Sequence, residues 1–209
     1  MFDYIRDPAE IYKNSFAAVR AATDLSGFSG IEADIVVRLV HACAMPEITE
    51  GLVFSDGAVA AGRQALGNGA SVLVDAEMVG HGIIKKNLAK KNAVLCTLND
   101  EGVAERAREA ATTRSAAAVD LWGDSLKDAV VAISNAPTAL FRLLELLDGG
   151  APRPALILGF PVGFIGAAES KDALIEHAPD FCVPFITLKG RRGGSALAAA
   201  AVNALVQST

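Results

Sequence analysis

Cysteine is scarce in this sequence. Three cysteines, Cys43, Cys96 and Cys182, occur in 209 residues, an odd number with no CxxC pair among them. The sequence therefore predicts neither a disulfide framework nor a zinc site. We expect three reduced, mostly buried thiols and no bound metal.

Long hydrophobic runs and an excess of positive charge are also missing. Apolar residues make up 52% of the chain, but a charged residue interrupts each run before it reaches bilayer length. The first ten residues, MFDYIRDPAE, have neither the basic nor the apolar region of a secretory signal. The net charge is −5, and no nucleic-acid-binding motif occurs. We expect a cytoplasmic protein that neither spans a membrane nor binds nucleic acid.

Short runs rich in Val, Ile and Leu dominate the sequence after residue 70. They do not alternate with polar residues, which indicates strands buried on both faces, as in a parallel sheet. Helical segments near 100–120, 136–148, 163–176 and 195–206 follow the later strands. The pattern predicts an α/β fold with a doubly wound, mainly parallel five-stranded sheet and helices on both faces. The expected strands are 71–76, 93–98, 129–134, 154–159 and 183–188.

Three more helices are expected before the first of these strands. Asp7 and Pro8 suit the N-cap and first position of a helix that continues to about residue 24. A second helix covers 31–44 and stops near Pro46, and a third starts after Ser55-Asp56 and ends near Gly67. No repeat or linker divides the chain, so residues 1–209 are expected to form one domain.

Ligands of doubly wound folds lie beyond the carboxyl ends of the strands. One such segment is Asn135-Ala136-Pro137-Thr138, which is either an ordinary strand-to-helix turn or a set of helix N–H groups for an anion. Another, GRRGGS, offers Arg191 and Arg192 before an Ala-rich helix, and is either an anion cradle or a plain turn. Glu169-Ser170-Lys171 is interpreted as a solvated helix face.

Phosphate-binding fingerprints are absent. Gly159, Gly163 and Gly166 do not form GxGxxG, and no GxxxxGK[ST] loop occurs. These absences argue against a nucleotide- or NAD-dependent enzyme, which is kept as the alternative function.

One histidine lies on an apolar helix, in VVRLVHACAMPE (36–47). His41 is either a packed core residue or the acid of an active site. Arg38 lies three positions earlier, hence on the same helix face. Arg114, near the start of an Ala-rich segment, is a second arginine that could hold a carboxylate as a bidentate fork.

Seven collinear stretches together resemble the precorrin-8X methylmutase family of cobalamin biosynthesis. They are DPAEIYKNSF (7–16), VVRLVHAC (36–43), DAEMVGHGI (75–83), TRSAAA (113–118), NAPTALF (135–141), PVGFIGAAESK (161–171) and GRRGGSALAAAAVNAL (190–205). In one departure, Ser134 stands where the family usually has glycine.

The resemblance implies an isomerase that moves a methyl group from C-11 to C-12 of precorrin-8X to give hydrogenobyrinate. The family uses no organic cofactor, forms homodimers and builds its site near the subunit interface. His41 matches the family's catalytic histidine, and it would act as a general acid in a [1,5] shift. His81 is at best auxiliary, and His177 is expected in a surface turn. The substrate-binding candidates are Ser15, Arg38, Thr97, Arg114, Asn135, Lys171 and Arg192.

A third possibility is a non-catalytic tetrapyrrole carrier. Such a protein would share the pocket but would tolerate loss of the acid. The substitution His41→Ala separates carrier from enzyme, because an enzyme would lose turnover and keep product binding.

Overall fold

The computed structural model describes residues 2–28 and 30–206. Its centre is a six-stranded sheet with the order β1-β6-β5-β4-β2-β3, in which β1 is antiparallel to β6 and all other neighbours are parallel. The strands are β1 (Leu52–Phe54), β2 (Val72–Val74), β3 (Val94–Leu95), β4 (Val130–Ile133), β5 (Leu156–Gly159) and β6 (Phe185–Leu188).

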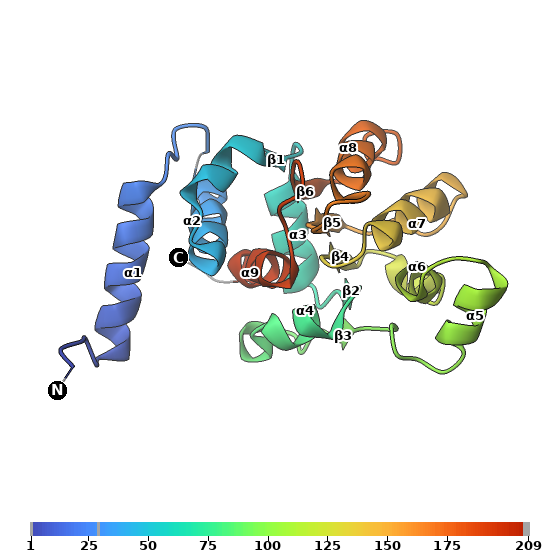
Figure 1. Cartoon of the computed structure of the whole chain (residues 1–209), viewed down its shortest axis with the longest axis horizontal. Coiled ribbons are helices and arrows are strands. Elements are labelled where there is room, and N and C mark those ends of the chain that lie inside the picture. Colours follow the sequence, from blue (N-terminus) through green and yellow to red (C-terminus); the bar gives the residue numbers. More distant parts are fainter. Residues whose placement is uncertain (1, 29, 207–209) are drawn as a thin grey trace.

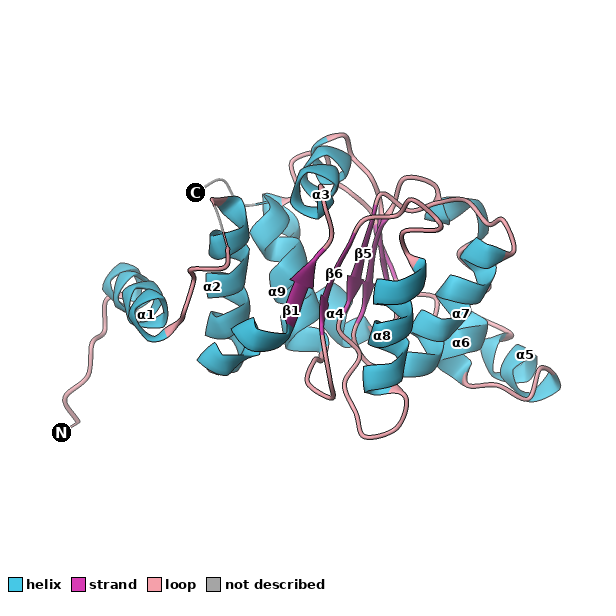
Figure 2. Ribbon diagram, turned by 90° about the horizontal axis from the view of Figure 1, so that it is seen from above, coloured by secondary structure: helices cyan, strands magenta, loops and turns pink. Residues whose placement is uncertain are grey.

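Helices cover both faces of this sheet, so the fold is a three-layer α/β/α arrangement, as predicted (Figures 1 and 2). One face carries α2 (Ile31–Cys43), α3 (Ala58–Gly67), α4 (Glu77–Gly82) and α9 (Ser195–Val206). The other face carries α6 (Arg114–Val119), α7 (Pro137–Asp148) and α8 (Ala167–His177). The helix α5 (Val103–Glu109) packs outside α6, and α1 (Pro8–Ala22) lies outside α2. Short 3-10 turns are η1 (Pro46–Gly51), η2 (Lys85–Asn87) and η3 (Gly123–Leu126).

The strands β2, β4, β5 and β6 are buried on both faces, which explains the lack of polar alternation in them. In β4, Val130 and Ala132 contact the α2/α9 layer, whereas Val131 and Ile133 contact the α7/α8 layer. All four residues of β4 are inaccessible to solvent. The apolar character of these strands is therefore a consequence of two cores that share one sheet.

All five predicted strands are present, but the predicted number is wrong because β1 is a sixth. Only three residues long, β1 pairs antiparallel with the edge of β6, with Val53 opposite Thr187. A run of three apolar residues is too short to be distinguished from a loop by composition. Its strand character comes from pairing with a segment more than 130 positions away in the chain.

The predicted helix at 100–120 is also wrong, since the segment forms two helices. Ala111 has a left-handed backbone conformation, with φ of 49°, which ends α5. The side chain of Thr113 then caps α6 by accepting a hydrogen bond from the amide of Ala116 at 3.1 Å. This break places Arg114 at the first position of α6.

The predictions for burial of the thiols and of the 169–171 segment need correction. Cys182 is exposed, and Cys43 and Cys96 are half-buried, so the thiols are not mostly buried. Ser170 and Lys171 are fully buried, and the predicted solvated face is limited to Glu169.

Within the described residues, no helix is both long enough and apolar enough to cross a bilayer.

Candidate active site

His41 lies in the last turn of α2, and its side chain is exposed rather than packed in the core. Residues Ile35 to Leu39 of the same helix bury their apolar side chains against α9, which leaves His41 on the outer face. Its ring nitrogen Nδ1 lies 3.0 Å from the hydroxyl oxygen of Ser15 on α1. The other nitrogen, Nε2, has no hydrogen-bond partner among the described residues. The imidazole is thus oriented from one side and available on the other.

Aromatic rings and an arginine surround this imidazole. The ring of Phe16 stacks on His41, with centroids 4.7 Å apart, and Tyr12 stacks on Phe16 at 4.3 Å. The guanidinium of Arg38 lies over the Phe16 ring at 5.3 Å and donates to the hydroxyl of Tyr12 at 2.9 Å. The structure therefore brings together three predicted site residues: Ser15, Arg38 and His41. Helical spacing put Arg38 and His41 on one face, but Tyr12 and Phe16 were not predicted to join them.

A pocket of about 230 Å³ opens beside His41. It is formed by the end of α2, the end of α4 and the first three turns of α9. Its lining residues are Arg38, His41, Ala42, Gly82, Ala196, Ala199, Ala200 and Asn203. Four alanines supply apolar surface, and Arg38, His41 and Asn203 supply polar groups, as expected for a site that orients a largely apolar ligand.

Two residues hold α4 against α9 at this pocket. A Cβ atom on Gly82 would lie 2.7 Å from the Cβ of Ala199, so only glycine permits this approach. Asn203, which is buried, accepts from the amide of Ile84 at 2.8 Å and donates to the carbonyl of Gly82 at 3.0 Å. The pocket wall is therefore built by backbone contact rather than by flexible side chains.

The turn before α9 carries two more predicted residues, Lys171 and Arg192. The buried amine of Lys171 donates to the backbone carbonyl of Arg192 at 2.7 Å, and burial lowers the pKa of this amine to about 8. The guanidinium of Arg192 is paired with Glu47 at 3.1 Å. Lys171 is thus placed to hold the turn, whereas Arg192 remains half-exposed near the end of α2.

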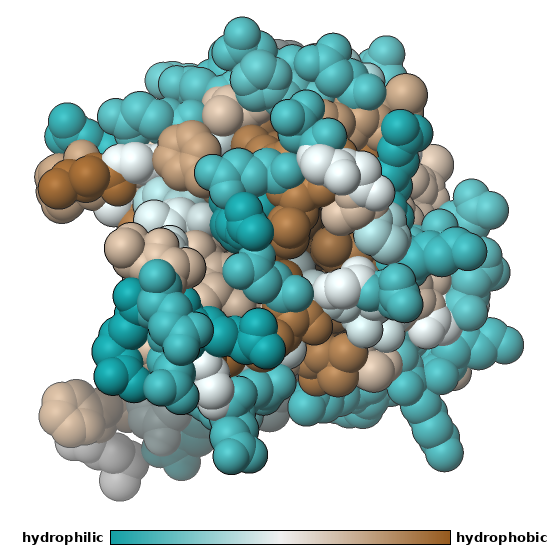
Figure 3. Space-filling view, turned by 90° about the vertical axis from the view of Figure 1, so that its right-hand side faces the viewer, coloured by the Kyte–Doolittle hydropathy of each residue, from teal (hydrophilic) through white to brown (hydrophobic). Residues whose placement is uncertain are grey.

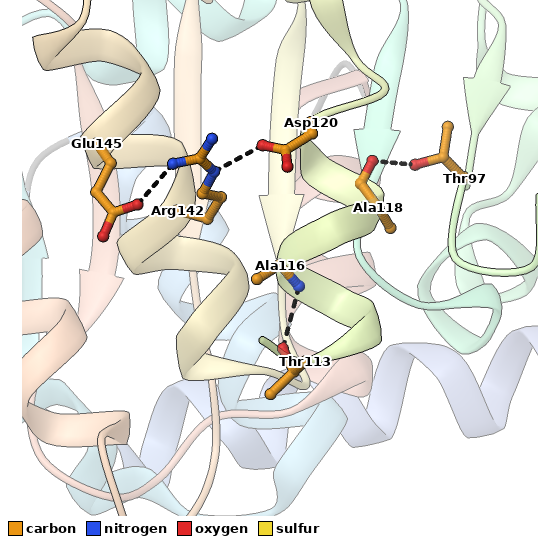
Figure 4. Close-up of polar contacts among 7 residues, drawn as sticks. All are labelled: Thr97, Thr113, Ala116, Ala118, Asp120, Arg142 and Glu145. Carbon is orange, nitrogen blue, oxygen red and sulfur yellow. Dashed lines mark hydrogen bonds and ion pairs between the residues drawn. The ribbon is translucent and has the colours of Figure 1, made fainter. Parts of the chain in front are cut away.

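Arg114 and Thr97 lie at α6, on the other side of the sheet. The guanidinium of Arg114 donates to the carbonyl of Leu98 at 3.1 Å and to Oδ1 of Asn99 at 2.8 Å, and the side chain is exposed. Figure 4 shows the Thr97 hydroxyl turned towards the carbonyl of Ala118 on α6, at 2.7 Å. Thr97 therefore anchors the helix that begins with Arg114, and its own donor is already used.

Asn135 is exposed, and its backbone amide donates to a carboxylate that sequence reasoning had not singled out. Asp75, directly after β2, accepts from the amides of Ser134, Asn135 and Ala136 at 2.9, 2.8 and 3.0 Å. It is only 3% exposed. Asp75 lies in one of the seven matching stretches, and an aspartate that ends a buried strand was the available signal.

His81 and His177 lie outside this constellation. His81 is exposed on α4 one residue before Gly82, and His177 ends α8, 3.7 Å from Asp180.

A second crevice, of about 380 Å³, lies between α7 and α8 and is lined by Phe141, Leu144 and Phe181 among others. Figure 3 faces this side of the molecule, where hydrophobic side chains gather at the centre among hydrophilic ones. The crevice contains none of the predicted site residues.

Several of the predicted site residues come after the carboxyl ends of strands. The segment after α2 reaches the carboxyl end of β6, since the carbonyl of Gly51 accepts from the amide of Lys189 at 2.8 Å. Arg192 follows β6 directly, and Asn135 follows β4. An exposed imidazole in an apolar pocket, with arginines around the carboxyl edge of a parallel sheet, is typical of an α/β enzyme that acts on an anionic substrate by acid–base chemistry.

Comparison with known proteins agrees with this class and narrows it. The family model described as precorrin-8X methylmutase matches residues 10–208. The chain is 54% identical to the precorrin-8X methylmutase of Pseudomonas aeruginosa over 98% of both chains, and 55% identical to that of a Sinorhizobium species over 99% and 97%. It is 36% identical to the cobalt-precorrin-8 methylmutase of Priestia megaterium over 95% and 87%. A crystal structure of the Thermus thermophilus precorrin-8X methylmutase superposes with a TM-score of 0.84 at 42% identity, covering 94% and 95% of the two chains.

The chain therefore belongs to the precorrin-8X methylmutase family. It is an isomerase of cobalamin biosynthesis, and its reaction moves a methyl group from C-11 to C-12 of the corrin precursor.

Proposed function

We propose that the chain converts metal-free precorrin-8X to hydrogenobyrinate, with His41 as the general acid. In a [1,5] shift the methyl group migrates with its bonding electrons, so that its bond to C-11 breaks as the bond to C-12 forms. A proton placed on a ring nitrogen makes C-12 more electron-deficient and lowers the barrier. The proton returns to His41 afterwards, so neither a nucleophile nor a hydride donor takes part.

The contact between Ser15 and His41 is the observation that carries this proposal. In the imidazolium form both ring nitrogens bear a proton. Nδ1–H can then donate a hydrogen bond to the hydroxyl oxygen of Ser15, 3.0 Å away. This contact leaves Nε2–H as the group that can donate to a ligand. Stacking on Phe16 restricts the ring to one plane. General acid catalysis by a residue held in this way contributes a factor on the order of 10²–10⁴.

Arginines are proposed to hold the acetate and propionate groups at the rim of the substrate. Arg38 lines the pocket beside His41, and Arg114 begins α6 on the opposite face of the sheet. Arg192 and the exposed side chain of Asn135 come after β6 and β4, at the carboxyl ends of these strands. Guanidinium groups form bidentate pairs with carboxylates, so contacts at these positions would fix the macrocycle relative to the acid.

The metal-free substrate is favoured by the pattern of identities. The Pseudomonas aeruginosa and Sinorhizobium relatives, which are named for precorrin-8X, share 54% and 55% identity with this chain, whereas the Priestia megaterium relative, which is named for cobalt-precorrin-8, shares 36%. Hydrogenobyrinate formed from precorrin-8X is the metal-free product. A direct comparison of turnover on the two substrates tests this choice.

We further propose that the enzyme is a homodimer that completes its site at the interface. The pocket beside His41 measures about 230 Å³, less than the roughly 300–1,000 Å³ of sites for drug-sized ligands. No residue of α1 is buried, although this helix supplies Ser15. Five of the eleven large hydrophobic side chains that are exposed in the described residues lie between Phe2 and Tyr12. Exposed apolar surface of this kind typically marks an interface.

The cytoplasmic location and the absence of nucleic-acid partners stay predictions. Both rest on the composition and net charge of the chain. Co-purification of nucleic acid with the protein, visible as excess absorbance at the nucleic-acid maximum, would contradict the second.

The substitution His41→Ala tests the function. We expect turnover of precorrin-8X to fall on the order of 10²- to 10⁴-fold, while hydrogenobyrinate still binds and gives its corrin absorbance in the protein fraction. His177→Ala is the matched control, because His177 is also exposed and lies at the end of α8 outside the pocket. Unchanged turnover of His41→Ala would contradict the acid role. Lost turnover together with lost product binding would show that His41 serves binding instead.

A further inference from the structure

Asp75 is a buried carboxylate that the proposed chemistry does not use. Its Oδ1 accepts from the amide and hydroxyl of Ser134 at 2.9 and 3.1 Å, and its Oδ2 accepts from the amides of Asn135 and Ala136 at 2.8 and 3.0 Å. Three successive amides that point at one spot form an anion-binding concavity. Burial raises the pKa of this carboxyl group, and the four donors oppose that shift by favouring its ionised form.

The carboxylate of Asp75 lies at the point of the sheet where the strand order reverses. β2 pairs with β3 on one side and with β4 on the other, so the strand order reverses between β2 and β4. Open α/β sheets bind phosphates and other ligands at this switch point. Here the carboxylate of Asp75 crosses from the end of β2 to the amides after β4 and occupies their anion position. The absence of a phosphate-binding fingerprint agrees with an anion position that the chain itself fills.

Elements that begin at this point lead to both halves of the candidate site. Ala76, next to Asp75, is the N-cap of α4, which ends at Gly82 in the pocket wall. The hydroxyl of Ser134 lies 3.1 Å from the hydroxyl of Ser195, where α9 begins. Both α4 and α9 therefore approach His41 from the switch point.

A second series of contacts leads from the same amides to Arg114. Ala136 is the N-cap of α7, and Thr138 in the first turn of that helix lies with its hydroxyl oxygen 2.7 Å from that of Thr113. Thr113 caps α6 directly before Arg114. Further along, Arg142 of α7 donates to Asp120 at 2.6 Å and to Glu145 at 2.8 Å, which fastens the end of α6 to α7 (Figure 4).

We propose that Asp75 is a positioning residue. Its carboxylate fills the anion-binding position at the switch point of the sheet, and these contacts keep the His41 pocket and Arg114 in fixed positions relative to each other. The activity part of this inference rests on the proposed function. The occupancy of the anion site does not, because it concerns only contacts within the chain. Misplacement of a substrate by about 1 Å can cost on the order of 10²-fold in rate, so a residue that touches no substrate can still control turnover.

Asp75→Ala with added formate tests the proposal. The substitution leaves the three amides in place and opens a space that a formate ion can fill. We expect kcat to fall on the order of 10²-fold and to recover at least about 10-fold, saturably, with sodium formate. Asp75→Asn is the matched control, because its amide group fills the same space and formate cannot enter. Sodium chloride at equal ionic strength controls for screening.

Thermal unfolding gives a second readout that needs no substrate. Formate should raise the Tm of Asp75→Ala and should leave the Tm of the unsubstituted protein and of Asp75→Asn unchanged. An Asp75→Ala protein that is fully active without formate would overturn the positioning role. A Tm that does not respond to formate would overturn the anion site, and this result stands whether or not the enzyme turns over precorrin-8X.

Discussion

The hydroxyl oxygen of Ser15 lies 3.0 Å from Nδ1 of His41, although the two residues are 26 positions apart and lie on separate helices. Ser15 belongs to α1, which buries none of its residues in this chain, and His41 belongs to α2, which is built into the core. The proposed acid is thus held by a core helix, and its hydrogen-bond partner is carried by a helix at the periphery.

Ser15→Ala is expected to lower kcat about fivefold, because a single hydrogen bond contributes about 1 kcal/mol. KM should change by less than about twofold if Ser15 acts only through His41. Steady-state kinetics with precorrin-8X give both parameters. Asn14→Ala, on the exposed surface of the same helix, is the control. A large rise in KM with an unchanged kcat would instead assign Ser15 to direct substrate binding.

Gly82→Ala should destabilise the protein and deform the pocket. The added Cβ would lie 2.7 Å from the Cβ of Ala199, and overpacking of this kind costs roughly 1–3 kcal/mol. We expect a lower urea midpoint and a raised KM. Gly67→Ala is the matched control, because it is also helical and a Cβ there meets nothing within 4 Å. That control should gain about 0.5–1 kcal/mol, and equal effects of the two substitutions would refute the close-contact argument.

The buried amine of Lys171 should make the free energy of unfolding rise with pH in the alkaline range. Burial lowers the pKa of its amine from 10.5 to about 8 in the folded protein. Between these two values the unfolded chain binds the proton and the native chain does not, so the free energy of unfolding should rise with pH. The predicted gain from pH 8 to pH 10 is about 2 kcal/mol relative to Lys171→Met.

Urea titrations of both proteins at several pH values measure this difference. The Met side chain has a similar length and does not titrate, so effects of all other groups cancel in the comparison. Parallel curves for the two proteins over this pH range would show that the amine is not destabilised by burial.

The proposed dimer predicts that a charge on α1 will break the assembly. Ile11 is 47% exposed, and Ile11→Glu would bury an unpaired carboxylate if α1 lies in an interface. We expect sedimentation at the mass of one 21.6 kDa chain instead of two, together with a loss of turnover. Lys13→Gln, two positions along the helix, should stay dimeric. A fully active Ile11→Glu dimer would place the interface elsewhere.

Local sequence patterns determined much of this structure, because they report on burial and on backbone geometry. Five Val-, Ile- and Leu-rich runs predicted the five parallel strands, and four of these, β2, β4, β5 and β6, are apolar because both of their faces are covered. Asp7 and Pro8 predicted the start of α1, and the Asp7 carboxylate does accept from the amide of Ala9 at 2.9 Å. The seven matching stretches identified the family that the comparisons confirm.

Only the tertiary structure decided which polar groups meet. Ser170 and Lys171 were interpreted as solvated, yet both are buried, because α8 packs against the turn before α9, where the carbonyl of Arg192, 21 positions from Lys171, accepts from its amine. The only local signal for Asp75 was its place at the end of a buried strand, and that place does not show which groups the carboxylate contacts. Its role follows from the strand order, which brings the amides of residues 134–136 beside it. Periodicity in a sequence records which side of an element is buried, but the contacts of a buried charge are set by neighbours that are distant in the chain.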